Sequence, residues 1–376
     1  MNRRVYFDYS STTNVHPDVL KAYMDLLKTT YVNSESLYDE GTLVSRNLEK
    51  ARNAISELLM IHPDEIIFTS GASEANSEAI KSVSFSMPEK KHIITSQIEH
   101  SSVLNACKQM EDVFGYRVTY LPVNEQGIVS VKDLKNALDN DTSVVSLMSV
   151  NNETGAINPI EEIKEIVKKT SSAYMHVDMT QAIGKVPCSF ENIDLASMSA
   201  HKIEGLKGSG ILVKKKHVPF VPLINGGEQE YGLRGGTNNA CTNMVFAKTL
   251  RIALENEKKY HDYVQKLQTL LLDQLKEIDG VEINNPENNL CSIVNFSYEN
   301  IPSEVMQNAL NRMGFMISAR STCESKSNNP SYVLKAMGYS DRRASSCIRI
   351  SLSYHNTEED ILDFIKALKE IISHYG

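Results

Sequence analysis

Two stretches of the sequence indicate the fold most clearly: YMHVDMTQ, residues 174–181, and LASMSAHK, residues 195–202. Each begins as a short apolar run that is followed by a charged side chain. This side chain is Asp178 in the first stretch and Lys202 in the second. Short apolar runs bounded in this way are typical of buried strands. Open α/β sheets bind ligands outside the carboxyl ends of their strands. The two stretches therefore predict successive buried strands with a ligand site at their ends.

Further apolar runs of the same kind occur along the first 215 residues. They are EIIFTS (65–70), HIITS (92–96), VVSLMSV (144–150) and GILVKK (210–215). Amphipathic stretches such as SEANSEAIKSVS and IEEIKEIVKKTS lie between several of them, with apolar residues at helical spacing. This alternation predicts a large α/β domain, in which helices cover both faces of a largely parallel sheet.

The pattern changes after a long, proline-free helical stretch at 242–278, which we expect to bridge to a second domain. The later segments VEI, CSIVNFSYE, FMIS and IRISLS, with helices near 303–313 and 357–374, indicate a small α+β domain. We predict a large domain of residues 15–255 and a small domain of residues 1–14 and 256–376. The polar, aperiodic stretch ARSTCESKSNNP (319–330) is expected to form an exposed loop of the small domain.

The composition is that of an ordinary soluble globular protein. The chain has 376 residues, 41% of them hydrophobic and 23% charged. A net charge of -8 argues against nucleic acid as the main ligand and against an electrostatic membrane anchor. Neither a signal peptide nor a membrane-spanning run of apolar residues is evident. Six scattered cysteines favour reduced thiols over disulfides or a zinc site, so we expect a cytoplasmic protein.

Three motifs together indicate an aldehyde cofactor that carries a phosphate. GASEAN (71–76) follows a strand and opens a helix, where small residues and the Ser73 hydroxyl suit an anion. Asp178 could pair with a protonated ring nitrogen. Lys202 follows an apolar strand, where desolvation favours the neutral amine that a Schiff base needs. Taken singly, each motif also fits a structural role: a turn capped by Ser73, a strand-end aspartate and a solvated lysine.

From its first strand to its last helix, the chain resembles the NifS/IscS-like cysteine desulfurases. These are class V aminotransferases with the fold type I pyridoxal-phosphate architecture. The resemblance rests on collinear motifs, namely DYSSTT (8–13), ARNAI, FTSGASEA, HIITSQIEHSSVL, SVNNETG, HVDMTQAIGK, SAHKIEGLKGSG, LRGGTNN, TCESKSNNPSYVLKAMG and IRISLS. It implies a mostly parallel seven-stranded sheet with a smaller α+β domain, pyridoxal 5′-phosphate as the cofactor, and a homodimer.

The resemblance also implies roles for the residues that match the family's motifs. Lys202 would bind the cofactor as a Schiff base, Asp178 would pair with the pyridine nitrogen, and Gln181 would hydrogen-bond the phenolic oxygen. His100 would stack on the ring and take part in proton transfer, although a buried, hydrogen-bonded histidine is the structural alternative. The phosphate would be held by Ala72, Ser73, Ser199 and His201, together with Thr237 from a second subunit.

The substrate side of the site is implied in the same way. Arg349, assisted by Asn152, would bind the substrate carboxylate; its structural alternative is a strand residue facing solvent. Cys323 would take up the substrate sulfur as a persulfide, converting L-cysteine to L-alanine, and a carrier protein would then receive it for iron–sulfur cluster assembly or tRNA thiolation. Two other functions stay open: a selenocysteine lyase or other class V lyase or aminotransferase, and a low-activity scaffold that binds a sulfur-carrier partner.

Overall fold

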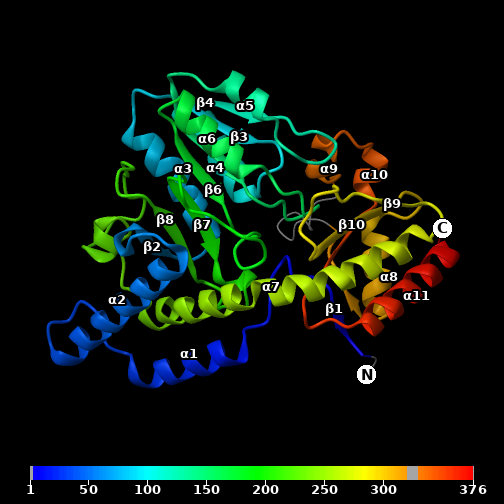
Figure 1. Cartoon of the computed structure of the whole chain (residues 1–376), viewed down its shortest axis with the longest axis horizontal. Helices are drawn as coiled ribbons and strands as arrows, with labels where there is room; N and C mark the ends of the chain where they lie inside the picture. The colour runs from blue at the N-terminus through cyan, green and yellow to red at the C-terminus, as the bar shows by residue number, and fades with distance from the viewer. Residues whose placement is uncertain (1–2, 320–328, 376) are drawn as a thin grey trace.

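The computed structural model describes residues 3–319 and 329–375 of the chain. Figure 1 shows two lobes, a larger one built on a seven-stranded sheet and a smaller one that holds sheets of three and two strands. Helix α7 (Ala240–Lys276) runs along the large lobe and into the small one, as predicted for 242–278. Within the described ranges, no helix is both long and apolar enough to cross a membrane.

The large sheet has the strand order β2-β8-β7-β6-β5-β3-β4. Strand β8 is antiparallel to both of its neighbours, and the other pairs are parallel, so the predicted mostly parallel sheet is confirmed. The strands are β2 (Ile66–Thr69), β3 (His92–Ser96), β4 (Arg117–Leu121), β5 (Thr142–Met148), β6 (Tyr174–Asp178), β7 (Leu195–Ser199) and β8 (Gly210–Lys214). Only β4 was missed, because this edge strand is mostly half-buried and has no continuous apolar run.

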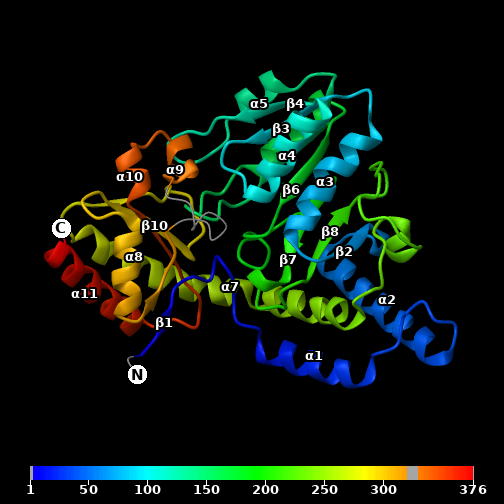
Figure 2. The same ribbon diagram turned by 180° about the vertical axis from the view of Figure 1, so that it is seen from behind.

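Both faces of the large sheet are covered by helices. Ile93 packs into the cluster under α3 and α4, whereas its neighbour Ile94 packs into the cluster on the other face, since successive strand residues point to opposite sides. Figure 2 shows α3 and α4 on the near face, and α6 lies in front of the sheet in Figure 1. The helices of this lobe are α1 (Pro17–Thr29), α2 (Asp39–Leu59), η1 (Pro63–Glu65), α3 (Ala72–Ser86), α4 (Ser101–Phe114), α5 (Val131–Ala137), α6 (Ile160–Thr170), η2 (Ala200–Lys202) and η3 (Gln229–Gly232).

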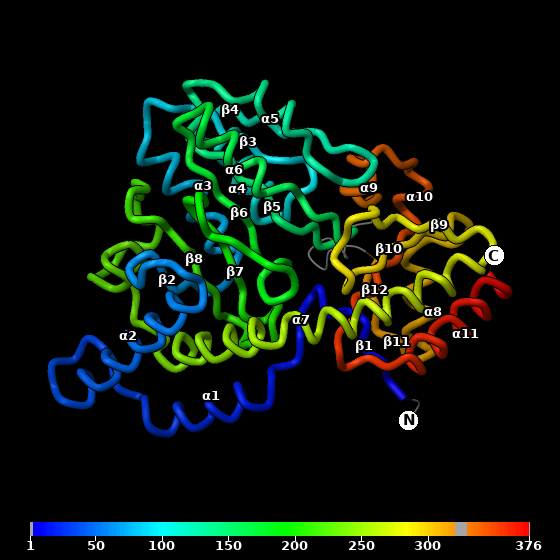
Figure 3. The backbone as a smooth tube through the Cα atoms, viewed as in Figure 1, coloured from blue at the N-terminus to red at the C-terminus, as the bar shows by residue number. Residues whose placement is uncertain are grey.

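The small lobe joins the two ends of the chain. Strand β1 (Val5–Tyr6) pairs in parallel with β11 (Phe315–Met316), so the start of the chain lies in this lobe. The division into residues 15–255 and residues 1–14 with 256–376 stays a prediction. After β1 the backbone rises between the lobes and then descends to α1, as the blue tube in Figure 3 shows. The remaining elements are β9 (Val281–Ile283), β10 (Ile293–Tyr298), α8 (Ser303–Arg312), α9 (Tyr332–Ala336), α10 (Asp341–Ser345), β12 (Cys347–Ser351) and α11 (Glu358–Tyr375).

The strand registers bring several strand ends to one edge of the large sheet. Met148 at the end of β5 pairs with Asp178 at the end of β6. Ser199 at the end of β7 and Thr69 at the end of β2 both pair with Gly210, the first residue of β8. Side chains that follow these strands therefore meet at the edge that faces the small lobe.

Candidate active site

A cavity of about 480 Å³ lies at this edge of the sheet. It brings together most of the residues that the sequence analysis singled out: Ala72, Ser73, His100, Asn152, Asp178, Gln181, Ser199, His201, Lys202 and Arg349. Thr237 does not line the cavity in this chain; it is exposed at the residues just before α7. Cys323 lies outside the described residues.

One end of the cavity is suited to an anion. Helix α3 begins there, and its first N–H groups carry a partial positive charge. Gly71, before the helix, has a φ of 150°, which a residue with a Cβ rarely adopts. A Cβ on Gly210 would lie 2.6 Å from the Gly71 Cα atom, so β8 passes this turn at a distance that only glycine permits. Backbone N–H groups are thus open to a ligand at this end.

Other groups at this end add donors and charge. The hydroxyl-bearing Ser73 and Ser199 line the wall, as does the exposed Lys207. Burial, together with the positive charges of Lys202 and Lys207, lowers the pKa of His201 to about 4. His201 is therefore neutral at pH 7, and its Nδ1 atom lies 3.2 Å from the Thr12 hydroxyl. This combination fits a phosphate group.

Lys202 is held in the cavity by the N-terminal segment. It ends the short helix η2, directly after β7. Its Nζ atom donates hydrogen bonds to the carbonyl oxygens of Ser10 at 2.5 Å and Ser11 at 2.8 Å. The amine is thereby fixed beside the other cavity residues, as a lysine that is to form a Schiff base requires.

Asp178 lies at the end of β6, as predicted, and accepts two hydrogen bonds from N–H donors. The Asn76 side-chain amide donates to Oδ2 at 2.8 Å, and the Thr180 backbone N–H donates to Oδ1 at 2.9 Å. These two hydrogen bonds replace hydrogen bonds to water that the buried carboxylate no longer makes. The carboxylate is thus prepared to face a cationic ring nitrogen.

Two buried ionisable neighbours of Asp178, His176 and Glu99, are mainly uncharged at pH 7. Burial lowers the pKa of His176 to about 4, and its ring nitrogens lie 2.8 Å from the hydroxyls of Ser146 and Ser197. Burial raises the pKa of the fully enclosed Glu99 to about 8. His176 and Glu99 therefore add no charge beside the Asp178 side chain, so a positive ring nitrogen has one defined partner.

The raised pKa of Glu99 predicts a pH-dependent effect of Glu99→Gln on stability. Between the ordinary value of 4.5 and about 8, the folded protein keeps a proton that the unfolded chain has lost, so the parent loses stability as the pH rises through this window. Glutamine cannot ionise. The unfolding free energy of the variant relative to the parent should therefore increase from pH 5 to pH 8, by on the order of 1.4 kcal/mol per pH unit.

Urea unfolding at several pH values measures this difference. Glu111→Gln, at an exposed position of α4, is the matched control and should give a difference that hardly changes with pH. A difference for Glu99→Gln that stays constant from pH 5 to pH 8 would show that Glu99 is already ionised in the folded protein.

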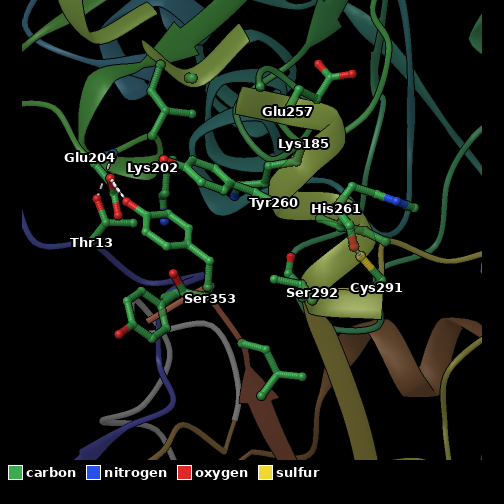
Figure 4. Close-up of a pocket in the computed structure, with 18 of the residues that line it drawn as sticks. Thr13, Lys185, Lys202, Glu204, Glu257, Tyr260, His261, Cys291, Ser292 and Ser353 are labelled. Carbon is green, nitrogen blue, oxygen red and sulfur yellow. Dashed lines mark hydrogen bonds between the residues drawn. The ribbon is translucent and has the colours of Figure 1, made fainter. Parts of the chain in front are cut away.

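Gln181 is held at both ends of its side-chain amide. Its Nε2 atom donates to the Ser10 carbonyl oxygen at 2.9 Å, and its Oε1 atom accepts from Lys185 Nζ at 2.9 Å. Burial, with smaller contributions from Lys202 and Arg349, lowers the pKa of Lys185 to about 7. Lys185 and Lys202 also line a second cavity of about 100 Å³ beside α7 (Figure 4). Lys185 thus supports Gln181 from behind the main cavity.

Arg349 is 1% exposed, so the alternative of a solvent-facing strand residue is wrong. Its Nη1 atom donates to the Asn152 carbonyl oxygen at 2.9 Å, and its Nη2 atom donates to Asp8 Oδ1 at 2.9 Å and Ser11 Oγ at 2.8 Å. Within the described part of the chain, three buried polar atoms of the cavity residues have no hydrogen-bond partner: Arg349 Nε, Asn152 Oδ1 and Thr180 Oγ1.

Buried polar atoms are seldom left without partners, so these atoms indicate a polar ligand. The cavity as a whole fits the predicted cofactor: an anion-binding end, a lysine amine and a carboxylate that faces no competing charge. It also keeps a guanidinium nitrogen for a second, carboxylate-bearing ligand.

Several residues of the site were missed by the sequence analysis. Asn76 and Ser102 contact residues of the predicted site, and Lys185 contacts Gln181. Asp8 belongs to the quoted motif DYSSTT, but no role was assigned to it. The sequence offers only spacings as signals for these contacts. One is the separation of four positions between Gln181 and Lys185 in QAIGK.

The chain is similar to known proteins over nearly its whole length. The sequence profile of the family described as aminotransferase class-V matches residues 5–364. Cysteine desulfurase IscS of Clostridium botulinum (strain Hall) is 40% identical over 379 residues, covering 99% of this chain and 95% of that protein. A solved NifS-like protein has 38% identity and a TM-score of 0.93, covering 99% of this chain and 100% of its own. SspA in complex with cysteine has 31% identity and a TM-score of 0.82, covering 94% and 99%.

Proposed function

This chain belongs to the class V aminotransferase family and is a pyridoxal-phosphate-dependent cysteine desulfurase, and on that premise we propose that Cys323 accepts the sulfur of L-cysteine. The observation that carries the proposal is the shared cavity of Lys202, Asp178 and Arg349. It joins a cofactor site to a guanidinium suited to the carboxylate of an amino acid. The cysteine in the name of the SspA complex supports the same substrate.

The residues of this chain would divide the binding of cofactor and substrate between them. Asp178 would hold the ring nitrogen, and Gln181 the phenolic oxygen. Arg349 and Asn152 would bind the substrate carboxylate. When bound, pyridoxal 5′-phosphate supplies an electron sink for the carbon skeleton of the substrate. The phosphate would lie against the start of α3, among Ala72, Ser73, Ser199 and His201.

The chemical step requires a base and a thiol. Lys202 would move protons, and His100, which lines the same cavity, would take part in proton transfer. The Cys323 thiolate would attack the substrate sulfur, so that an S–S bond forms while the C–S bond breaks. The electron pair of that bond stays with carbon, which takes up a proton to give L-alanine. Cysteine plus the Cys323 thiol thus become alanine plus a Cys323 persulfide.

The five other cysteines, including Cys347, are buried or half-buried and are poor candidates for the acceptor. Burial raises the pKa of Cys107 and Cys188 to about 12 and that of Cys291 to about 11, and it also raises the pKa of Cys241. Because the thiolate is the nucleophile, these protonated thiols are unreactive at neutral pH. Their burial supports Cys323 as the acceptor.

Mass spectrometry after incubation with L-cysteine tests this proposal. One extra sulfur should appear on the peptide that contains Cys323, with alanine in solution in matching amount. Alanine without sulfur on that peptide would instead favour a lyase in which Cys323 is incidental, and selenocysteine as a second substrate would identify a selenocysteine lyase. Absence of alanine altogether would favour a scaffold that binds a sulfur carrier.

A homodimer would complete the phosphate site with Thr237 from the second subunit. Thr237 is exposed here and lies near the start of α7, against which α1 and α2 pack (Figure 1). Apolar side chains are exposed on these two helices and the segment between them, namely Leu20, Met24, Leu27, Tyr31, Leu37 and Leu43. A protein partner would remove this surface from water, which supports pairing of two copies. A carrier protein would then receive the sulfur for iron–sulfur cluster assembly or tRNA thiolation.

Replacing Arg349 should damage substrate binding far more than cofactor binding. An Arg349→Ala variant is expected to lose about 10²-fold in kcat/KM for L-cysteine, mainly through KM, because a charge-assisted contact to the carboxylate is gone. Arg349→Lys keeps the positive charge but cannot make two parallel hydrogen bonds to a carboxylate. Its kcat/KM should lie between those of the parent and Arg349→Ala.

Steady-state kinetics at saturating cofactor measure this effect. The absorbance of the bound cofactor serves as the control and should remain. An Arg349→Ala variant with unchanged KM would mean that the carboxylate binds elsewhere. Asp8 loses its ionic partner in this variant, so its thermal midpoint should also fall.

A further inference from the structure

A chain of hydrogen bonds joins Asp178 to His100 beneath the cavity. The Asn76 amide nitrogen donates to Asp178 Oδ2 at 2.8 Å and to the Ser102 hydroxyl oxygen at 2.9 Å. The Ser102 hydroxyl in turn lies 2.8 Å from His100 Nδ1. Asn76 is fully buried and comes from α3, whereas Ser102 is in the first turn of α4. Two helices thus connect the two predicted cofactor contacts.

The carboxylate fixes the direction of the first two hydrogen bonds, those that the Asn76 amide donates. Asp178 Oδ2 only accepts, so the amide nitrogen of Asn76, not its oxygen, must face it. The second hydrogen of the same nitrogen points to Ser102 Oγ, which therefore accepts there. The Ser102 hydroxyl keeps one hydrogen, which it can donate to His100 Nδ1 2.8 Å away.

The backbone gives His100 the same orientation. His100 is the N-cap of α4, and its Nδ1 atom accepts a hydrogen bond from the Ser102 backbone N–H at 3.2 Å. An acceptor of N–H and O–H hydrogens cannot itself carry a proton. The proton of the neutral imidazole must therefore be on Nε2, and a second proton on Nδ1 would face the positive end of the helix.

We propose that Asn76 and Ser102 are positioning residues that tie His100 to Asp178 and hold its ring with the proton on Nε2, so that His100 offers the substrate–cofactor complex a hydrogen-bond donor. This inference rests on the proposed function. It assigns proton abstraction to Lys202, whereas His100 orients its ligand through Nε2–H and can donate that proton. The burial of Asn76 keeps water from competing for either amide hydrogen.

Nitrogen NMR of holoenzyme labelled with ¹⁵N-histidine tests the tautomer directly, with a His100→Asn variant to assign the signal. The parent should show a protonated Nε2 and an unprotonated Nδ1 at pH 7 to 8. Ser102→Ala should raise the population of the other tautomer, and Ser102→Thr, which keeps the hydroxyl, should restore the parent spectrum. A parent signal with the proton on Nδ1 overturns the proposal.

Kinetics with L-cysteine test the coupling. Ser102→Ala should lower kcat by about 3- to 10-fold, the effect of one hydrogen bond, with KM nearly unchanged. Ser101→Ala, at the adjacent helix position, is the matched control and should leave kcat unchanged. The coupling between Asp178 and His100 requires every hydrogen bond of the series. The double variant Asn76→Ala/Ser102→Ala should therefore be no slower than Asn76→Ala alone. Losses that multiply overturn the coupling, as does an unchanged kcat in Ser102→Ala.

The two measurements separate this proposal from the proposed function. The spectrum reports the His100 proton whether or not the protein turns over cysteine. A parent spectrum with the expected tautomer in a protein that makes no alanine would reject the desulfurase function and keep the positioning role.

Discussion

A Lys202→Ala variant is expected to lose the absorbance band at about 420 nm that a cofactor Schiff base gives. Its desulfurase rate should fall by about 10³-fold or more. The reason is that both proposed tasks of Lys202, the covalent link to the cofactor and proton transfer, depend on one amine. That amine is held at 2.5 and 2.8 Å by the carbonyl oxygens of Ser10 and Ser11. Among the described residues, two other lysines lie near: Lys185, whose Nζ atom is bound to Gln181, and Lys207, which lines the same cavity.

Absorbance spectra and alanine release measure the Lys202 prediction. Lys207→Ala is the contrasting variant, because Lys207 lines the same cavity at its anion-binding end. It should keep the Schiff-base band while binding the cofactor more weakly. Added methylamine should restore part of the rate of Lys202→Ala, since a free amine can replace a missing base. A Lys202→Ala protein with a normal band and rate would place the Schiff base on another lysine.

Cys323→Ala should abolish the persulfide and lower alanine formation by roughly 10²- to 10³-fold, while leaving the cofactor absorbance intact. Without this thiol the substrate sulfur has no nucleophile, although the cofactor and the carboxylate contacts remain. The rate of alanine release in the presence of a reductant, together with mass spectrometry of the protein, measures the effect.

Cys188→Ala provides the matched control for Cys323. Cys188 is half-buried, and its pKa is raised to about 12, so its removal should change neither the persulfide nor the rate. If Cys323→Ala releases sulfide from cysteine as fast as the parent, the sulfur leaves without this acceptor, and the lyase alternative gains the support that the desulfurase loses.

The fold and the centre of the site could be predicted because their signals are local. Asp178 and Lys202 each follow an apolar run, and parallel strands bring their ends to one edge. The resemblance to a family then supplied partners for these two residues, and the cavity contains nearly all of them. Strand β4 was not predicted, because this edge strand has one buried residue and no continuous apolar run.

The supporting contacts could not be predicted because they join distant parts of the sequence. Asn76 contacts Asp178 across 102 positions, and Arg349 contacts Asp8 across 341. No spacing rule covers such pairs, since their proximity results from the packing of separate elements. The role of Thr237 requires a second subunit, and that of Cys323 concerns residues beyond the described ranges.

The contacts between the two ends of the chain have a consequence for how the protein is made. Asp8 and Ser10 find their partners in β12, on Arg349 and Ser351, 341 residues later. At a synthesis rate of 5–20 residues per second, the first dozen residues wait roughly 20 to 70 seconds after leaving the ribosome before these partners exist. The large sheet, with the cofactor residues between Ala72 and Lys202, can fold in that interval. The N-terminal segment that contacts Lys202 is expected to be anchored by Arg349 and Ser351 only after translation has passed β12.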